Sequence, residues 1–279
     1  MTDFSKFVIA SDLDGTFAIG GRLVERNLEA LERFRAGGGL FTLATGRAHL
    51  NLRSAIGEPT RLINAPAICD NGAYLYDFLQ HRNLQEDLLR AEDARALLEF
   101  IRRYFPDVRF SASAVSCIRS EENAGYVAKD MKTYDPPAVC ICPADTWALD
   151  DWYKLLFFDD TPRLSEVSDA LLAHFGDRFV PTFSNTWILE VQYPGINKAL
   201  GLQKLKKQLG GLAERTVIAC GDFDNDIQML QAADVAICPA NARENVKPYA
   251  DHVLCHCEEG LIAAVIEAIE SGKISPKTV

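Results

Sequence analysis

Short apolar segments alternate with amphipathic helices at both ends of the chain, and this alternation limits the possible folds more than any other feature. The apolar segments are interpreted as strands at 8–14, 40–44, 66–69, 216–220 and 234–238. The helical spacing of apolar residues predicts helices at 23–36, 48–56, 198–209, 226–233 and 260–270. Apolar strands separated by helices are typical of a parallel sheet that is covered on both faces. The sequence therefore predicts an α/β fold with a Rossmann-like, doubly wound parallel sheet.

The middle of the chain interrupts this alternation. It combines helices with strand-like runs, at 92–105, 108–118, 152–158, 164–175, 179–183 and 186–193. This mixture predicts an α+β unit inserted into the parallel one. We expect a core formed by residues 1–82 and 190–279, and a cap formed by residues 83–189. The insert has 11 basic and 18 acidic residues, so it carries −7 of the formal net charge of −10.

Composition excludes several classes of function. The 279 residues are 48% hydrophobic, which is too apolar for a mainly disordered chain. With 29 basic and 39 acidic residues, the chain is not expected to bind nucleic acid or an anionic membrane surface, which require clustered Lys and Arg. No apolar run reaches about 18 residues, and the acidic start MTDFSKFVIASDLDG does not resemble a signal peptide. The sequence therefore predicts a cytoplasmic protein, and it does not reveal the oligomeric state.

Two carboxylates, Asp12 and Asp14, end the first predicted strand in the segment Ser-Asp-Leu-Asp-Gly-Thr. Because the chain turns at a strand end, both side chains can reach one centre. A close pair of carboxylates can bind a hard divalent cation, or can divide acid and base roles between them. Alternatively, the segment is a turn in which Asp and Gly only supply loop geometry.

Two further polar clusters also follow predicted parallel strands. Thr45-Gly46-Arg47 comes after 40–44, and the acidic run from Gly221 to Asp226 comes after 216–220. Ligands of open α/β sheets bind at this carboxyl edge, and a hydroxyl beside backbone N–H groups at a helix start can hold phosphate. Alternatively, these clusters have no role in binding: Thr45 is then only a helix cap, and the acidic run is only a solvated turn. The five histidines show no ligand or triad pattern and are predicted to be structural.

At these motifs the chain resembles the haloacid dehalogenase superfamily, in particular its Cof-like phosphatases. The motifs that match lie in the family's order along the predicted core: Asp12-Leu13-Asp14-Gly15-Thr16, Thr45-Gly46-Arg47, Gly195-Ile196-Asn197-Lys198, Gly221-Asp222 and Asn225-Asp226. The insert lies between the second and third motifs, where this group carries its cap domain. Cys238-Pro239 departs from the family's pattern, but it lies outside the motifs.

The resemblance implies catalytic and metal-binding roles. Asp12 would attack phosphorus and form an aspartyl-phosphate. Asp14 would protonate the leaving oxygen and later accept a proton from the hydrolytic water. Asp12, the backbone carbonyl of Asp14 and Asp222 would hold Mg²⁺. Asp226 would not bind the metal directly, but would influence the metal or a neighbouring lysine through its contacts with the groups around them.

The resemblance also implies a phosphate-binding set, formed by Thr45, the Gly46 N–H, Lys198 and Asn225. The expected protein is a Mg²⁺-dependent phosphatase that hydrolyses small phosphorylated metabolites such as sugar phosphates. The alternatives are a phosphomutase of the same fold and a non-catalytic metabolite-binding protein. Because the insert is acidic, we expect it to favour monophosphates of neutral polyols or sugars over more anionic substrates.

Overall fold

The computed structural model describes residues 2–121, 138–210 and 214–277. Contacts within the chain divide it into two compact units. The core unit comprises Met1–His49, Ala55–Glu86 and Asn197–Val279, and the cap unit comprises Leu50–Ser54 and Asp87–Ile196. Most of the predicted insert 83–189 falls in the cap unit, whereas the domain boundaries themselves stay a prediction.

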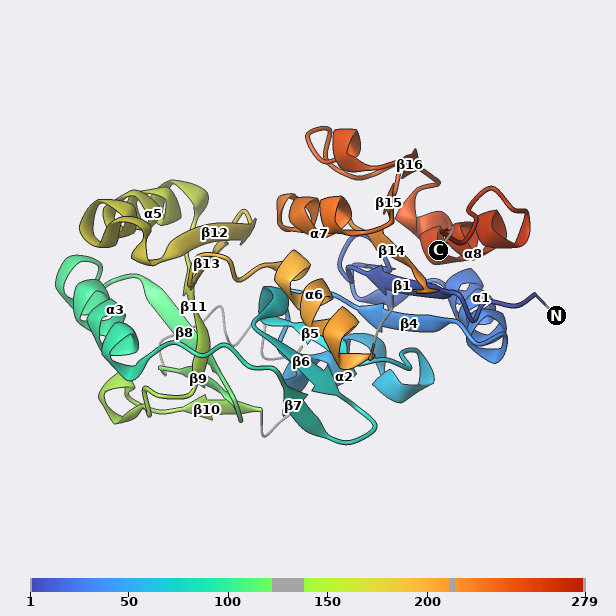
Figure 1. Ribbon diagram of the computed structural model, residues 1–279. Helices are drawn as coiled ribbons and strands as arrows, with labels where there is room; N and C mark the ends of the chain where they lie inside the picture. The colour runs from blue at the N-terminus through green and yellow to red at the C-terminus, as the bar shows by residue number, and fades with distance from the viewer. Residues whose placement is uncertain (1, 122–137, 211–213, 278–279) are drawn as a thin grey trace. The chain divides into compact units, whose positions relative to one another are not determined.

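A parallel sheet forms the centre of the core unit. Its strand order is β16-β15-β14-β1-β4, and every neighbouring pair is parallel. The strands are β1 (Phe7–Ser11), β4 (Leu40–Leu43), β14 (Thr216–Cys220), β15 (Val235–Cys238) and β16 (His252–Val253). In Figure 1, β1 lies between β4 and β14, as the pairing requires. The predicted α/β class with a parallel sheet is thereby confirmed.

Helices of the core unit pack on this sheet through their apolar stripes. They are α1 (Glu25–Ala36), α6 (Lys198–Gln208), α7 (Ile227–Ala232) and α8 (Leu261–Glu270). Leu202 and Leu205 of α6 share one buried cluster with Val8 of β1 and Val217 of β14. Burying such side chains contributes roughly 1.5–3 kcal/mol each. Helix α6 is therefore held against the sheet with its first residue, Lys198, at the carboxyl edge.

Short antiparallel elements complete the core unit. They are β2 (Ala18–Ile19) with β3 (Arg22–Leu23), and a sheet of β5 (Ala67–Cys69), β6 (Tyr74–Asp77) and β7 (Arg82–Leu84). The segment 66–69 was predicted as a strand of the parallel sheet. Its backbone pairing with that sheet is an isolated parallel bridge between Ala44 and Ile68, because β5 pairs mainly with β6.

The cap unit is a mixed sheet covered by two helices. The strand order is β10-β9-β8-β11-β13-β12, and α3 (Ala91–Tyr104) and α5 (Thr161–Phe175) share one apolar cluster with it. The strands are β8 (Arg109–Ala114), β9 (Ile118–Ser120), β10 (Val139–Ile141), β11 (Trp152–Phe158), β12 (Val180–Asn185) and β13 (Ile188–Gln192). A short helix, α2 (Leu52–Ile56), crosses the boundary between the two units.

The run 108–118 is not one strand, as its composition suggested. The Ala114 N–H donates to the Cys117 carbonyl, which makes a tight turn, and β9 then pairs antiparallel with β8. Small residues such as Ser and Ala fit either geometry, so the pattern alone did not reveal the break.

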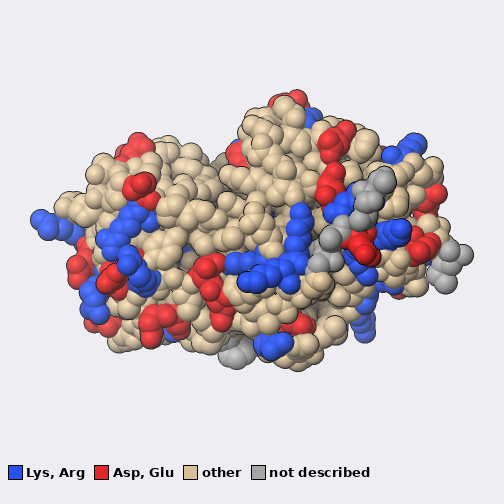
Figure 2. Space-filling model, in the orientation of Figure 1, with Lys and Arg blue, Asp and Glu red and all other residues tan. Residues whose placement is uncertain are grey.

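The described residues contain no helix with the length and apolarity to cross a membrane. On the face shown in Figure 2, basic side chains are interspersed with acidic ones.

Candidate active site

Asp12 lies directly after β1, and it is joined to a buried lysine. Lys198 Nζ donates to Asp12 Oδ1 at 2.5 Å and to Asp226 Oδ1 at 2.6 Å. Lys198 is the first residue of α6, behind the helix cap Asn197, whose side chain accepts from the Leu200 N–H. Lys198 and Asp226 are fully buried, and the Asp12 side chain is 11% exposed. Three residues predicted from separate motifs therefore form one charge cluster.

Asp226 is fixed by the turn that follows β14. Its Oδ2 accepts from the backbone N–H groups of Asp222 and Phe223, both at 3.0 Å. The turn needs glycine at position 221, because a Cβ there would lie 2.4 Å from the Asp226 Cβ. Both oxygens of Asp226 thus have donors inside the protein. This arrangement fits the supporting role that the resemblance implied for Asp226.

Asp222 is held from the side of the first motif. Thr16 Oγ1 donates to Asp222 Oδ1 at 2.5 Å. Gly15 has φ +93°, and a Cβ there would lie 2.5 Å from Asp222 Oδ2. The Asn241 side chain donates to the Gly15 carbonyl and so supports the same loop. The glycine therefore makes room for Asp222 beside the loop that carries Asp12.

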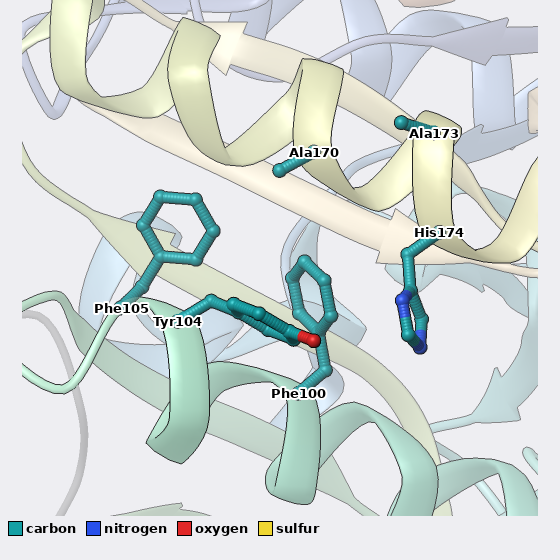
Figure 3. Close-up of a pocket in the computed structure, with 6 residues that line it drawn as sticks. All are labelled: Phe100, Tyr104, Phe105, Ala170, Ala173 and His174. Atoms are coloured by element: carbon teal, nitrogen blue, oxygen red, sulfur yellow. The ribbon is translucent and has the colours of Figure 1, made fainter.

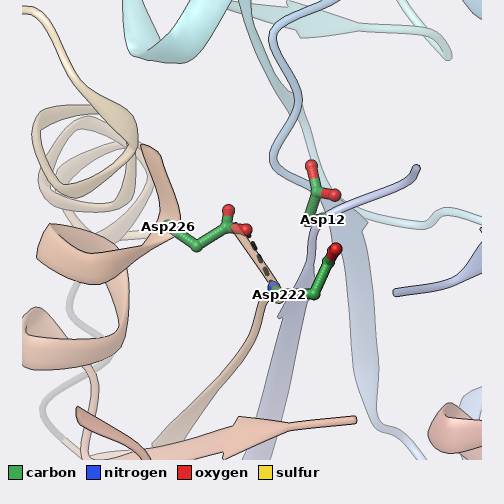
Figure 4. Close-up of side chains that lie close together, drawn as sticks. All are labelled: Asp12, Asp222 and Asp226. Atoms are coloured by element: carbon green, nitrogen blue, oxygen red, sulfur yellow. Dashed lines mark hydrogen bonds between the residues drawn. The ribbon is translucent and has the colours of Figure 1, made fainter. Parts of the chain in front are cut away.

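The three carboxylates could hold a metal ion. One oxygen from each of Asp12, Asp222 and Asp226 lies within 4.8 Å of the others (Figure 4). An all-oxygen donor set suits a hard cation such as Mg²⁺ or Mn²⁺. Because both oxygens of Asp226 already have donors, Asp12 and Asp222 are the better placed ligands.

The charges of the cluster support this fit. Burial raises the pKa of Asp12 well above its usual range, and the nearby acids Asp226, Asp222 and Asp14 act in the same direction, against the attraction of Lys198. Burial also raises the pKa of Asp222 to about 6. For Lys198, burial alone would lower the pKa, but Asp12 and Asp226 outweigh it and raise the pKa. One lysine does not balance these acids, so a divalent cation would relieve the repulsion.

Asp14 faces a different partner. Its two carboxylate oxygens accept from Arg47, with Nε to Oδ2 at 2.7 Å and Nη2 to Oδ1 at 2.9 Å. The Asp14 side chain is half exposed and does not belong to the metal-binding cluster. The loop after β4 that carries Arg47 is itself ordered, since the Thr45 hydroxyl accepts from the Arg47 N–H at 3.1 Å.

The predicted phosphate-binding residues all lie in the core unit. Thr45 is buried two residues after the end of β4, with Gly46 beside it. Asn225 Nδ2 donates to Asn71 Oδ1 at 3.1 Å, and Asn71 takes the left-handed conformation, with φ +54°. Lys198 contacts the carboxylates of Asp12 and Asp226, as described above. Their contact with a phosphate group stays a prediction.

Sequence reasoning gave no role to four residues that hold the site together, namely Thr16, Arg47, Asn71 and Asn241. Thr16 and Arg47 lie within the first and second motifs, so the motif itself was the available signal for these two, whereas Asn71 and Asn241 lie outside the motifs given above. The partners of all four, however, lie 33 to 226 residues away in the chain.

A separate hollow lies in the cap unit. Its volume is about 430 Å³, and it is lined by Phe100, Tyr104, Phe105, Ala170, Ala173 and His174 (Figure 3). These side chains come from α3 and α5 and from the residue that follows α3. The lining has no carboxylate, Lys or Arg, so it does not suit a metal or a phosphate group.

Comparison with known proteins agrees with this site. A family model for haloacid dehalogenase-like hydrolases matches residues 9–266, and the chain belongs to this family. It is similar to the pyridoxal phosphate phosphatase YbhA of Escherichia coli, with 27% identity over 88% of this chain and 92% of that protein. It is also similar to the 5-amino-6-(5-phospho-D-ribitylamino)uracil phosphatase YwtE of Bacillus subtilis, with 24% identity over 95% of this chain and 98% of that one.

A solved structure shows the same fold. It is a haloacid dehalogenase-like hydrolase from Bacteroides thetaiotaomicron, with a TM-score of 0.80 and 26% identity, covering 94% of this chain and 99% of that one. The expected resemblance to Cof-like phosphatases is confirmed, and the protein is a phosphoric monoester hydrolase.

Proposed function

We propose that the protein is a Mg²⁺-dependent phosphatase of small phosphorylated metabolites that works through an aspartyl-phosphate. The observation that carries the proposal is the contact of Lys198 with both Asp12 and Asp226 beside Asp222. A bound cation would offset negative charge on the nucleophile and on the phosphoryl group. Asp12 and Asp222 would hold it, together with the backbone carbonyl of Asp14.

In the first half-reaction, a carboxylate oxygen of Asp12 attacks phosphorus, and the bond from phosphorus to the alcohol oxygen breaks. Asp14 gives its proton to that departing oxygen. Both Asp14 oxygens accept from Arg47, so one of these hydrogen bonds has to open for the proton transfer. Thr45, the Gly46 N–H, Lys198 and Asn225 would hold the phosphoryl oxygens.

In the second half-reaction, water attacks the phosphorus of the aspartyl-phosphate. Asp14 takes a proton from that water, and the bond between phosphorus and the Asp12 oxygen breaks. Inorganic phosphate leaves, and both carboxyl groups return to their first state. The Lys198 ammonium stays beside Asp12 throughout and limits the build-up of negative charge.

The related enzymes support small substrates. One is named for pyridoxal phosphate, and another for a uracil derivative that carries a phosphorylated ribityl chain. For this chain we propose sugar or polyol phosphates. We also expect a cytoplasmic location, since all eight cysteines are free thiols, as is usual in a reducing compartment.

A phosphate-release screen with about fifty metabolites tests the proposal, using the wild type and Asp12→Asn. Loss of the nucleophile should reduce turnover by several orders of magnitude. Asp3→Asn, an exposed acid of the same unit, is the matched control and should retain wild-type turnover. Turnover of Asp12→Asn within tenfold of the wild type would contradict the assignment. Release of isomerised sugar phosphate without inorganic phosphate would instead indicate a phosphomutase.

A further inference from the structure

A strained turn lies next to the phosphate-binding residues of the core unit. It follows β5 and comprises Asp70, Asn71 and Gly72, whose φ angles are +46°, +54° and +94°. We call these three residues the left-handed turn. Residues other than glycine rarely adopt this conformation, because their Cβ comes too close to the backbone carbonyl oxygen. Such strain persists only where the surrounding structure imposes it, and it is concentrated at functional sites.

The left-handed turn holds the loop that follows β4. The Asp70 N–H donates to the Arg47 carbonyl oxygen at 3.1 Å. The Asn71 N–H donates to the Thr45 carbonyl oxygen at 3.0 Å. Because the donors are consecutive in the chain, they fix the part of the loop that carries Thr45 and Gly46 of the proposed phosphate-binding set.

The left-handed turn also packs against the start of α6. A Cβ at Gly72 would lie 2.2 Å from the Asn197 carbonyl oxygen, so glycine is needed for this close approach. Further along α6, the buried Lys204 Nζ donates to the carbonyl oxygens of Gly72 and Ala73, at 2.8 and 2.7 Å. The turn is therefore fastened to the helix whose first residue is Lys198.

The side chain of Asn71 connects the left-handed turn to the loop after β14. Asn71 is 6% exposed, and its Oδ1 accepts from Asn225 Nδ2 at 3.1 Å. Asn225 is only half-buried. An amide nitrogen carries two hydrogens, so one can point to Asn71 while the other donates to a ligand. A buried acceptor behind a half-buried amide thus favours one orientation of that amide.

We propose that Asn71 is a positioning residue for phosphate binding, and that it orients the Asn225 amide with an N–H toward the phosphoryl group. The inference rests on the proposed phosphatase function, in which Asn225 binds phosphate. Phosphoryl oxygens accept hydrogen bonds, so an amide turned by 180° would place its carbonyl oxygen against them and weaken binding. Position 71 must both adopt the left-handed conformation and supply an acceptor, which asparagine does and glycine does not.

A glycine at position 71 separates these two properties. Asn71→Gly keeps the left-handed backbone at no steric cost but removes the acceptor. His81→Gly is the matched control, because His81 is an exposed residue with φ +51° in the turn between β6 and β7 of the same unit. Calorimetric titration with inorganic phosphate, in the presence of Mg²⁺ and without a phosphate ester, measures the Kd of each variant.

The expected result is a coupling between Asn71 and Asn225. The phosphate Kd should rise at least about tenfold in Asn225→Ala, which loses a donor to a charged ligand. It should rise at least about threefold in Asn71→Gly, because the Asn225 side chain then has to be ordered on binding. Adding Asn71→Gly to Asn225→Ala should raise the Kd no further, since the amide to be oriented is already absent. His81→Gly should bind phosphate like the wild type.

The outcomes separate this inference from the function on which it rests. A wild-type Kd in Asn71→Gly, with weaker binding in Asn225→Ala, would overturn the inference and leave the phosphatase function intact. A further loss of the same size in the double variant would also overturn it, because Asn71 would then act by another route. If Asn225→Ala binds phosphate like the wild type, Asn225 is not a phosphate ligand, and the inference fails with that assignment. If the wild type neither binds phosphate nor releases it from any ester, the proposed function itself fails.

Thermal unfolding checks that each variant is folded. Should Asn71→Gly unfold, Asn71→Ser replaces it, because serine fills more of the space but holds its oxygen one bond closer to the backbone. The same pattern of Kd values is expected for the folded serine variant, alone and combined with Asn225→Ala. If both substitutions at Asn71 unfold the protein, its side chain serves the fold, and the inference is wrong.

Discussion

The guanidinium of Arg47 donates a hydrogen bond to each carboxylate oxygen of Asp14, from Nε to Oδ2 at 2.7 Å and from Nη2 to Oδ1 at 2.9 Å. Such a two-point contact fixes the plane of the carboxyl group as well as its position. If Asp14 is the general acid, Arg47 sets the direction in which its proton is delivered. Arg47 is then a positioning residue, and its effect should depend on the presence of Asp14.

We predict that Asp14→Asn lowers kcat by about 10²- to 10⁴-fold for a sugar phosphate, because an alkoxide needs a proton to leave. The loss should be much smaller for p-nitrophenyl phosphate, whose phenolate leaves unprotonated. Arg47→Gln should lower kcat for the sugar phosphate only while Asp14 is present. Steady-state kinetics of the two single variants and the double variant measure this coupling.

Arg33→Gln, which removes an exposed arginine of α1, serves as the control and should leave both substrates unaffected. Independent, additive losses in the double variant would show that Arg47 does not act through Asp14.

Lys198 provides a second prediction, in which stability and activity separate. Lys198→Met leaves the carboxylates of Asp12 and Asp226 buried without their cation. Breaking such a pair typically costs about 3–5 kcal/mol, so the free energy of unfolding in urea should fall by that order. Turnover should fall by at least about 10³-fold, since the phosphoryl group loses the same cation.

Adding Asp226→Asn to Lys198→Met should restore part of the free energy of unfolding, because one buried charge is removed, while turnover stays low. Recovery of turnover in this double variant would mean that Lys198 acts only on the fold.

The strands around this site could be predicted because buried parallel strands are continuous apolar runs. β4, β14 and β15 lie within one residue of the predicted ranges, whereas β1 ends at Ser11, three residues before the predicted end of its strand. Asp12 and Asp222 could be placed at one edge because both follow such strands. The hydrogen bonds from Arg47 to Asp14 could not be predicted, because they depend on the conformations of two side chains that are 33 residues apart in the sequence. In the cap unit, Lys154 of β11 donates to Glu190 of β13 at 2.8 Å, and this ion pair depends on the register of the two strands, which no local pattern reports.

Metal dependence is the third prediction. Chelation should stop phosphate release, Mg²⁺ or Mn²⁺ should restore it, and Ca²⁺ should inhibit because its looser coordination misplaces Asp12. Binding should also be visible without any reaction. At a Mg²⁺ concentration 100 times its Kd, the folded state gains about 2.7 kcal/mol, which should raise Tm by several degrees.

Asp222→Asn should abolish this rise in Tm. Asp224→Asn is the matched control, because Asp224 lies in the same turn but pairs with Arg243 and Asn245 and belongs to no metal-binding group among the described residues. Full activity in excess chelator, or an equal loss of the Tm shift in both variants, would refute the assignment of Asp222 as a ligand.

His49 was predicted to be structural, and its surroundings give that role a measurable consequence. Its ring stacks on Tyr76 at 3.8 Å, with an angle of 10° between the planes, and Nδ1 lies 2.8 Å from the Tyr74 hydroxyl. Burial lowers the pKa of His49 to about 4 from an ordinary value near 6.5. The unfolded chain therefore binds a proton at pH values where the folded protein keeps His49 neutral.

This difference in proton uptake fixes the direction in which stability changes with pH. The contribution of His49 to stability is fully present above about pH 6.5, decreases as the pH falls, and is lost near pH 4. Between pH 7 and pH 5 the wild type should lose about 2 kcal/mol of unfolding free energy through this residue. Urea denaturation at the two pH values measures the loss, and His49→Asn, which cannot titrate, should lose about 2 kcal/mol less than the wild type. His252→Asn removes an exposed histidine of the same unit and should follow the wild type. If the free energy of unfolding falls equally in His49→Asn and in the wild type between pH 7 and pH 5, the prediction is wrong. The imidazole of His49 is then not kept neutral by its burial against Tyr74 and Tyr76.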